Sequence, residues 1–309
     1  MAAVIEWKIY SFELPLVTGG IRKGLAVQLS DGWGEVAPYP GRSQETIDQA
    51  IEQLLRVLSG EEEKLLPSVQ FGLESALSHF QPVKAPLYAF LNGSVEEILR
   101  RAEASFAQGY RTAKVKISTL SVDAAIGLLN RLKDRFRLRV DCNNAFSFRD
   151  AVSIFSRFEP SVFDYIEDPT RETSRLAEFP YPFALDETIS SLPIDTYPQL
   201  YGFILKPTVL GGKKGCAPFI QLAKKHNLKV VFSPVFESGL GLLQILNVAS
   251  HFGLLSEPIG LDTHRYLAQD VLLPSINFNT PIISVESPPE VNPSILQEIA
   301  HGKCQLPHF

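Results

Sequence analysis

Cysteines are scarce in this sequence, and they do not occur in pairs. Only three are present in 309 residues, at Cys142, Cys216 and Cys304, far apart and without a Cys-x-x-Cys motif. This spacing argues against a disulfide framework or a zinc knuckle and favours a reducing compartment. The six histidines show no His-x-His or His-Glu-x-x-His spacing, so a metal site built from imidazoles is not indicated.

Long apolar runs and basic clusters are also missing. No segment reaches about 18 uninterrupted apolar residues, so none is expected to span a bilayer. The formal net charge is −5 without a basic run, which argues against a general binder of nucleic acid. Glu6 and Lys8 interrupt any signal-peptide core near the start of the sequence. We therefore expect a cytoplasmic protein with no nucleic-acid or membrane partner; the sequence does not indicate an oligomeric state.

The first 85 residues have the pattern of a small α+β domain. Two strand-like runs precede two segments whose apolar residues recur at helical spacing. These four segments are residues 4–12, 25–29, 47–58 and 69–80. The last residues, from about 265 to 309, lose the regular alternation seen before them. We expect this tail to pack against residues 1–85 and to complete a capping domain.

Between residues 86 and 264, strands alternate with helices. The predicted strands are residues 87–91, 112–117, 138–141, 164–167, 183–186, 202–206 and 229–233. Helices fit between most of them, notably at 215–226 and 240–252. Such alternation predicts a parallel sheet, for which a closed barrel is the natural solution. The expected fold class is α/β: a modified TIM barrel, (β/α)₇β, with an α+β capping domain.

Polar residues recur at the ends of these strands, about once per βα unit. They are Lys116, Asp141, Glu167, Asp186, Lys206 and Ser233. The carboxyl ends of parallel barrel strands meet on one face, where barrel enzymes keep their active sites. A single charge at a strand end is more simply explained as structural. The repetition in phase with the strands predicts that several of these side chains share one pocket.

Three of these strand-end residues are carboxylates: Asp141, Glu167 and Asp186. Carboxylates held close together repel one another unless a positive charge lies among them. Oxygen ligands without a neighbouring histidine or cysteine suit a hard cation, Mg²⁺ before Zn²⁺. The alternative is three separate salt bridges with some of the 29 lysines and arginines. We favour a Mg²⁺ site in which Mn²⁺ can substitute.

Three lysines are candidates for the chemistry. Lys114 and Lys116 are two residues apart in a strand, so both point into the barrel. Two inward cations require carboxylates, and a second ammonium nearby helps one lysine to lose its proton. We expect Lys114 to pair with the carboxylates and Lys116, nearer the mouth, to act as the base. Lys206 lies roughly opposite; a Schiff-base role is the competing interpretation, which the carboxylate triplet disfavours.

These residues resemble the motifs of the enolase superfamily. The resemblance rests on Lys114-x-Lys116, on the three strand-end carboxylates and on Lys206-Pro207. Within the superfamily, the sequence is similar to the o-succinylbenzoate synthase family in residues 32–38 and 40–46 and in the row from Arg139 to Asn143. The similarity covers nearly the whole chain.

The resemblance implies an enzyme of menaquinone biosynthesis. Its reaction is the Mg²⁺-dependent syn-dehydration of 2-succinyl-6-hydroxy-2,4-cyclohexadiene-1-carboxylate to o-succinylbenzoate. In this interpretation Asp141, Glu167 and Asp186 hold the Mg²⁺ that binds the substrate carboxylate. Lys116 removes the α-proton and then helps the hydroxyl group to leave, and Lys206 stabilises the enediolate from the other face.

Two alternatives to a dehydratase stay open at this point. Because two opposed lysines also suit proton exchange, one is a racemase or epimerase of N-acylamino acids or dipeptides on the same fold. The other is a metal-stabilised binding protein, which would need a missing catalytic group. No such group is missing from the sequence.

The substrate, a small carboxylate, needs further contacts. The candidates are Lys114, Arg139, Asn143, Arg22, Ser233, Ser238 and Gly239. Arg139 is expected to neutralise the carboxylates. Residues 18–24 match the family's mobile specificity loop, from which Arg22 would screen the distal carboxylate, although a solvated charge is an equal alternative. Ser238 and Gly239 open a helix, and helix N-terminal amides favour a carboxylate.

Overall fold

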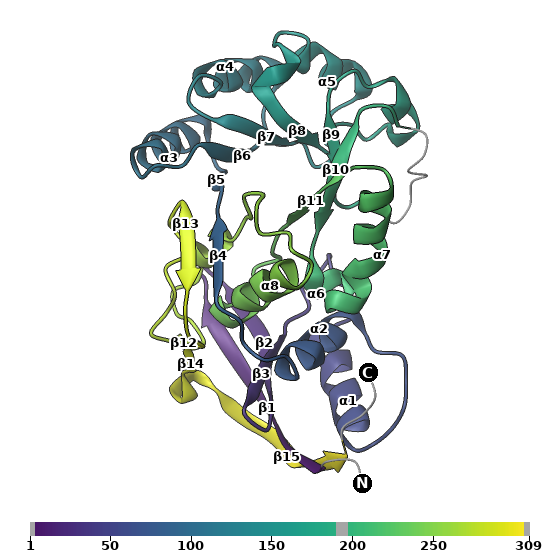
Figure 1. The fold of residues 1–309 in the computed structure, drawn as a ribbon. Helices are drawn as coiled ribbons and strands as arrows, with labels where there is room; N and C mark the ends of the chain where they lie inside the picture. The colour runs from purple at the N-terminus through teal and green to yellow at the C-terminus, as the bar shows by residue number, and fades with distance from the viewer. Residues whose placement is uncertain (1–3, 190–196, 306–309) are drawn as a thin grey trace.

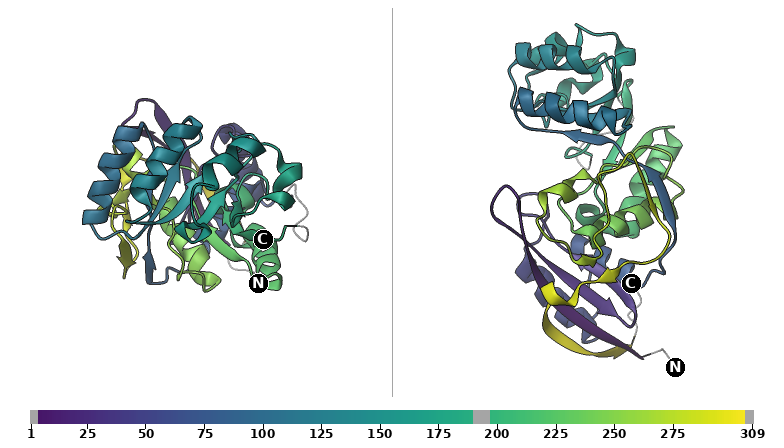
Figure 2. Two further views of the ribbon diagram at one scale, coloured as in Figure 1. Left: turned by 90° about the horizontal axis from the view of Figure 1, so that it is seen from above. Right: turned by 90° about the vertical axis from the view of Figure 1, so that its left-hand side faces the viewer.

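The computed structural model describes residues 4–189 and 197–305. The chain forms two lobes, one with the parallel sheet and one with the antiparallel sheet, and the helices of residues 207–251 lie between the two sheets (Figure 1 and Figure 2). No helix among the described residues is long and apolar enough to cross a membrane.

The capping lobe is built on a four-stranded antiparallel sheet. Its order is β15 (Gln297–Gln305), β1 (Val4–Pro15), β2 (Ile21–Leu29) and β3 (Gly32–Val36). Exposed and buried residues alternate along β1, so one face of the sheet is apolar. That face packs against α1 (Ile47–Leu58) and α2 (Pro67–Ala76), which confirms the predicted α+β pattern. Because β15 pairs with β1, the tail completes this sheet.

Seven parallel strands form the barrel sheet in sequence order. They are β5 (Ala89–Leu91), β6 (Thr112–Lys116), β7 (Arg137–Asp141), β8 (Phe163–Glu167), β9 (Phe183–Leu185), β10 (Leu200–Leu205) and β11 (Lys229–Phe232). The stretch around Ile259 occupies the eighth position. It bridges Leu87 in parallel, and the Gly260 N–H donates to the Phe232 carbonyl oxygen at 3.3 Å. These contacts link both edges of the seven-stranded sheet, as the expected (β/α)₇β barrel requires.

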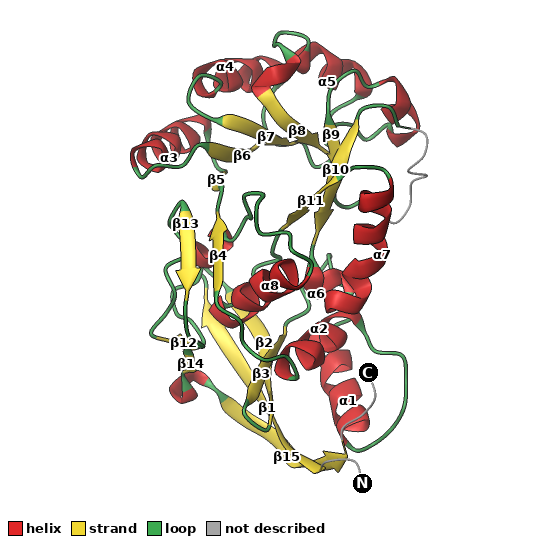
Figure 3. Cartoon of the chain, viewed as in Figure 1, coloured by secondary structure: helices red, strands yellow, loops and turns green. Residues whose placement is uncertain are grey.

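Six helices accompany the described part of the barrel sheet (Figure 3). They are α3 (Val95–Ala107), α4 (Val122–Leu132), α5 (Phe148–Phe155), α6 (Pro207–Leu210), α7 (Gly212–Lys225) and α8 (Gly239–His251). Of these, α3, α4 and α5 lie against the outer side of the sheet, whereas α6 and α8 lie next to the capping lobe. Serine side chains cap α3, α4, α5 and α8 at Ser94, Ser121, Ser147 and Ser238. Between β8 and β9 the connection holds only a short 3₁₀ turn, η2 (Thr173–Glu178).

The remaining short elements join the two lobes. β4 (Val83–Pro86) pairs with β13 (Ile282–Val285), and β12 (Leu272–Leu273) pairs with β14 (Glu290–Val291). Further 3₁₀ turns in the described residues are η1 (Pro160–Val162), η4 (Asp262–Tyr266) and η5 (Pro293–Ile295). The boundaries expected near residues 85 and 264 stay predictions.

Candidate active site

The strand ends meet at one mouth of the barrel, as their spacing predicts. In register, Lys116 of β6 lies beside Asp141 of β7, which in turn lies beside Glu167 of β8. Asp186 and Lys206 directly follow β9 and β10. A cavity of about 160 Å³ opens here, and the predicted site residues that line it are Lys114, Lys116, Asp141, Asn143, Asp186, Lys206 and Ser233.

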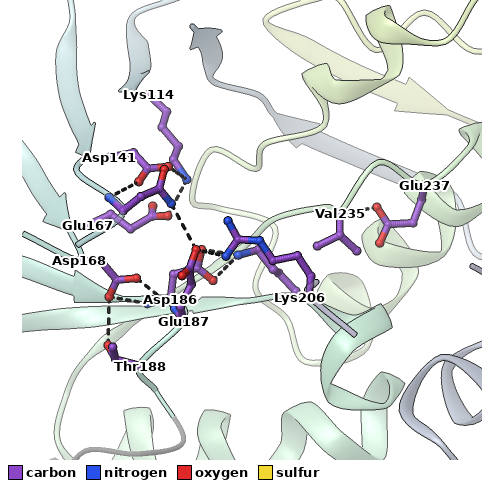
Figure 4. A network of polar contacts seen from close by, with 12 residues as sticks. Lys114, Asp141, Glu167, Asp168, Asp186, Glu187, Thr188, Lys206, Val235 and Glu237 are labelled. Carbon is purple, nitrogen blue, oxygen red and sulfur yellow. Dashed lines mark hydrogen bonds and ion pairs between the residues drawn. The ribbon is translucent and has the colours of Figure 1, made fainter. Parts of the chain in front are cut away.

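Lys114 is a buried cation held between two carboxylates. Its Nζ lies 2.7 Å from Glu167 Oε1 and 3.1 Å from Asp141 Oδ2 (Figure 4). Burial alone lowers the pKa of Lys114, but attraction to Asp141 and Glu167 outweighs it and leaves the pKa well above its ordinary value. Lys114 is therefore a fixed positive charge, which makes it unsuitable as a base.

Glu167 is a buried carboxylate whose charged form is disfavoured by its surroundings. Burial and repulsion from Asp141 raise its pKa well above the usual range, although Lys114 opposes the shift. Its second oxygen, Oε2, is buried and has no hydrogen-bond partner among the described residues. A buried carboxylate oxygen left in this way has the capacity to accept a further donor or cation.

Asp186 is paired with Lys206 and is held in place by Asp168. The Lys206 ammonium donates to both carboxylate oxygens of Asp186. Burial raises the pKa of Asp186, but Lys206 and Lys114 together bring it below its ordinary value. Asp168 accepts hydrogen bonds from the N–H groups of Asp186 at 3.3 Å and Glu187 at 3.0 Å, so it fixes the turn after β9 (Figure 4).

The three carboxylates fit a hard divalent cation by the chemistry of their donors. They are oxygen ligands at neighbouring strand ends, and Glu167 offers an unpartnered oxygen. In the described part of the chain, no group of three or more His, Cys, Asp or Glu side chains is arranged to hold a metal ion. Lys114 and Lys206 instead neutralise these carboxylates. Binding of a cation would thus compete with these two ammonium groups.

Unlike Lys114 and Lys206, Lys116 has no counter-ion among the residues that the structure describes. Its side chain is half-buried and lines the cavity. Within residues 4–189 and 197–305, no ion pair joins it to a carboxylate. Of the three lysines, it is the one whose nitrogen is left available to a ligand.

Arg139, a predicted substrate contact, is not among the residues that line the cavity. It points from β7 into the barrel core, fully buried between the rings of Tyr88 and Tyr165 at 5.2 and 5.1 Å. Its Nε donates to Asp164 Oδ2 at 2.8 Å, and Nη1 donates to the Pro258 carbonyl oxygen at 2.6 Å. Arg139 thus binds residues of the core. Asn143, two residues beyond Asp141, does line the cavity and keeps an unpartnered Oδ1 in the described structure.

The N-terminus of α8 is already occupied by carboxylates of the protein itself. Glu35 accepts from the N–H of Ser238 at 3.1 Å and from its hydroxyl group, and Asp270 accepts from the Gly239 N–H at 2.7 Å. Ser238 is fully buried. Protein carboxylates thus hold the position at which a substrate carboxylate was expected, and neither Ser238 nor Gly239 lines the cavity. This arrangement was not predicted, because nothing in the sequence shows that Glu35 reaches the N-terminus of α8.

Arg22 also lies elsewhere than expected. It belongs to β2 rather than to a loop, it is 5 % exposed, and it does not line the cavity. Four hydrogen bonds join its guanidinium to backbone carbonyl oxygens, among them those of Phe236 and Pro38 at 2.9 Å. The guanidinium of Arg22, which we expected to screen the distal carboxylate of the substrate, is therefore bound by the protein's own backbone.

Several cavity residues were not singled out from the sequence. They are Tyr39, Arg42, Tyr88, Phe90, Phe236, Asp262 and Thr263. Arg42 forms an ion pair with Glu187, so the capping lobe reaches the end of β9. Tyr39 and Arg42 lie in or beside residues 40–46, a segment used above only for its resemblance. The sequence pattern did not mark the other five as site residues.

Comparison with known proteins follows the two lobes. Residues 97–289 match the family model "Enolase C-terminal domain-like", and residues 5–80 match "MenC, N-terminal domain". The o-succinylbenzoate synthase of Yersinia pseudotuberculosis is 31% identical over 317 residues, which cover 90% of this chain and 96% of that protein. The chain belongs to the o-succinylbenzoate synthase family of the enolase superfamily.

Solved structures of the superfamily share the fold. The o-succinylbenzoate synthase from Thermosynechococcus elongatus BP-1, complexed with Mg in its active site, has a TM-score of 0.68 at 21% identity. That match covers 84% of this chain and 93% of the other. The L-Ala-D/L-Glu epimerase from Bacillus subtilis has a TM-score of 0.74 at 17% identity, with 92% and 96% of the two chains covered. The fold is therefore shared by an o-succinylbenzoate synthase and an epimerase.

Proposed function

We propose that this member of the o-succinylbenzoate synthase family dehydrates 2-succinyl-6-hydroxy-2,4-cyclohexadiene-1-carboxylate to o-succinylbenzoate. One observation carries the assignment of roles within the site. Lys116 and Lys206 line the same cavity from β6 and β10, with the carboxylate-bearing strands β7, β8 and β9 between them in the sheet. A substrate carboxylate in this cavity would have an amine nitrogen on either side.

Lys116 serves as the acid–base group in this proposal. As the neutral amine it takes the α-proton, and the electron pair of the broken C–H bond moves into the enediolate. The ammonium form of Lys116 then gives that proton to the departing hydroxyl group, which leaves as water as the ring becomes aromatic. Because one residue performs both transfers, the proton and the hydroxyl group leave from the same face.

Lys206 and the carboxylates supply electrostatic stabilisation. Lys206 faces the substrate as a cation and stabilises the enediolate, a role that needs charge but no proton transfer. Asp141, Glu167 and Asp186 would hold Mg²⁺, for which Mn²⁺ can substitute. When bound there, such an ion supplies positive charge to the substrate carboxylate. Lys114 holds Asp141 and Glu167 in position.

The second candidate is an epimerase or racemase of N-acylamino acids or dipeptides. The two lysines on one cavity favour it, because epimerisation takes a proton from one face and returns one on the other. Lys206 would then have to exchange protons. In this structure its ammonium group is paired with Asp186, whereas Lys116 has no counter-ion among the described residues. This asymmetry favours one acid–base lysine and hence the dehydratase.

The test is to incubate the purified protein with the cyclohexadiene substrate and Mg²⁺ and to follow the formation of o-succinylbenzoate. A parallel reaction in D₂O with an N-acylamino acid or a dipeptide measures deuterium uptake at the α-carbon. Dehydration without comparable deuterium uptake supports the proposal. Rapid deuterium uptake with no dehydration would reverse the assignment in favour of the epimerase.

A further inference from the structure

The loop between β11 and α8 forms part of the cavity wall in an uncommon backbone conformation. Val235 and Phe236 of this loop line the cavity. Phe236 has a φ of 67°, in the left-handed region that bulky residues rarely occupy. Its ring stacks on that of Tyr39 from the capping lobe, with the ring centroids 5.5 Å apart. Something must hold this backbone in place, because the conformation is unfavourable on its own.

Arg22 of the capping lobe makes the contacts that hold it. Its Nε donates to the carbonyl oxygen of Phe236 at 2.9 Å. Nη1 donates to the carbonyl oxygen of Pro38 at 2.9 Å, and Nη2 donates to that of Ala37. The guanidinium carbon also lies 5.3 Å from the centroid of the Tyr39 ring. One side chain therefore fixes both the backbone of Phe236 and the segment that carries Tyr39.

Two buried carboxylates complete this anchor of the loop. Glu237 accepts a hydrogen bond from the Val235 N–H at 2.6 Å (Figure 4). It also accepts one from the Thr208 hydroxyl group. Glu35 accepts from Ser238 at the other end of the loop. Both carboxylates interact electrostatically with Arg22, which offsets part of the cost of burying its charge.

The Tyr39–Phe236 stack separates two cavities. Besides the active cavity, a second one of about 620 Å³ lies against the strand that carries Arg22. It is lined in part by Ile21, Arg22, Pro38 and Thr46. Tyr39 and Phe236 line both cavities, so their stacked rings form the partition. If the stack came apart, the active cavity would lose one wall and open into the second cavity.

We propose that Arg22 is a positioning residue: by holding the Tyr39–Phe236 stack it sets the affinity of the active cavity for its substrate without touching that substrate. This inference rests on the proposed function, since the substrate is the one assigned above. Arg22 is suited to this role because its hydrogen bonds go to backbone carbonyl oxygens. The wall carries no acid–base group of the reaction, so it contributes binding shared by the ground state and the transition state.

The test is a double-mutant cycle between Arg22→Lys and Phe236→Ala. Lysine keeps the positive charge but does not reproduce the forked hydrogen bonds of a guanidinium. We expect each single variant to raise KM by about tenfold, the effect of one lost apolar contact in a pocket, with kcat little changed. The double variant should have the KM of Phe236→Ala alone, because Arg22 acts through Phe236. Multiplicative KM effects would mean that Arg22 contacts the substrate itself and would overturn the proposal.

Lys23→Met is the matched control. Lys23 is the next residue of β2, is exposed, and pairs with Glu13 at 2.7 Å, so its loss should leave KM unchanged. An Arg22→Lys variant with a lowered melting temperature but an unchanged KM would reduce Arg22 to a structural role and contradict the inference. Wild-type turnover, measured first, tests the proposed function separately from these variants.

Tyr39→Ala provides a second test that leaves every buried charge in place. It removes the other ring of the stack and should raise KM, with an effect that is not additive with that of Phe236→Ala. An unchanged KM in Tyr39→Ala would overturn the proposal even if Arg22→Lys fails to fold.

Discussion

The ammonium group of Lys114 spans the width of one strand to reach Glu167, with 2.7 Å between Nζ and Oε1. The same nitrogen contacts Asp141 on the strand between them. These contacts explain why two lysines two residues apart differ in their surroundings. Lys114 neutralises Asp141 and Glu167 from deeper in the barrel. Lys116 lies at the mouth and has no counter-ion among the described residues.

Replacing Lys116 by alanine should abolish dehydration. Both the removal of the α-proton and the departure of the hydroxyl group are assigned to this side chain. General acid–base catalysis contributes about 10²–10⁴-fold, so the loss in kcat should reach or exceed that range. Lys116→Arg should not restore activity, because a guanidinium stays protonated. Steady-state kinetics on both variants checks this; a kcat within tenfold of wild type in Lys116→Ala would assign the proton transfers to another group.

Replacing Lys114 by methionine should destabilise the metal-free protein. Removing one partner of a buried ion pair leaves uncompensated charge, which typically costs about 3–5 kcal/mol. The exposed pair of Lys23 with Glu13 offers the control, since solvent screens such pairs and their loss changes stability little. Urea unfolding of Lys114→Met and Lys23→Met in EDTA measures both. Equal free energies of unfolding for the two variants would show that Lys114 does not balance the carboxylates.

Chelation by EDTA should abolish activity, and Mg²⁺ or Mn²⁺ should restore it. The proposed ligands are three carboxylates, which bind hard cations. Asp186→Asn should weaken Mg²⁺ binding while the fold is retained, because the variant removes one ligand charge from the site. Isothermal titration with Mg²⁺, together with circular dichroism, checks this variant. Unaltered Mg²⁺ affinity would remove Asp186 from the proposed ligand set.

Glu35 should make the stability of the protein depend on pH. Burial raises its pKa from 4.5 to about 7, although the Ser238 hydroxyl group opposes the shift. The folded state then binds more protons at Glu35 than the unfolded state does between these values, so the contribution of Glu35 to stability is greatest below pH 4.5 and falls as the pH rises towards 7. For this residue the loss is on the order of 3 kcal/mol, from 1.36 kcal/mol per pKa unit.

Glu35→Gln isolates this contribution from those of other carboxyl groups. Because glutamine does not titrate, the variant should lose less stability than the wild type as the pH rises. The difference between the free energies of unfolding of the two proteins should therefore change across pH 4.5–7. Urea unfolding of both proteins at several pH values gives this difference. A constant difference over the whole range would show that Glu35 keeps an ordinary pKa in the folded protein.

The strand-end residues could be predicted from the sequence because they follow a simple geometric rule. Parallel strands end on one face of a barrel, so Lys116, Asp141 and Lys206 come together whatever the packing of the helices. The side chains of the capping lobe follow no such rule. Glu35 and Arg22 contact the β11–α8 loop more than 200 positions away in sequence. Such contacts depend on how the two lobes dock, which no local pattern encodes.

Side-chain direction within a strand also limited the prediction. Arg139 and Asp141 share a face of β7, but only Asp141 is at the mouth. Two residues along a strand move a side chain by about 6.6 Å, enough to place Arg139 in the core beside Asp164. The alternation of faces was predicted correctly, whereas the depth of each side chain in the barrel required the structure.

The division of labour between the two cavity lysines is the central claim, and the dehydration rate of Lys206→Arg tests it most directly. If Lys206 acts only as a cation, arginine partly replaces it, and Lys206→Arg should retain clearly more activity than Lys206→Ala or Lys116→Ala. Single-turnover measurements of o-succinylbenzoate formation compare the three variants without interference from product release. A Lys206→Arg enzyme as inactive as Lys116→Ala would contradict the account, because Lys206 would then have to transfer a proton.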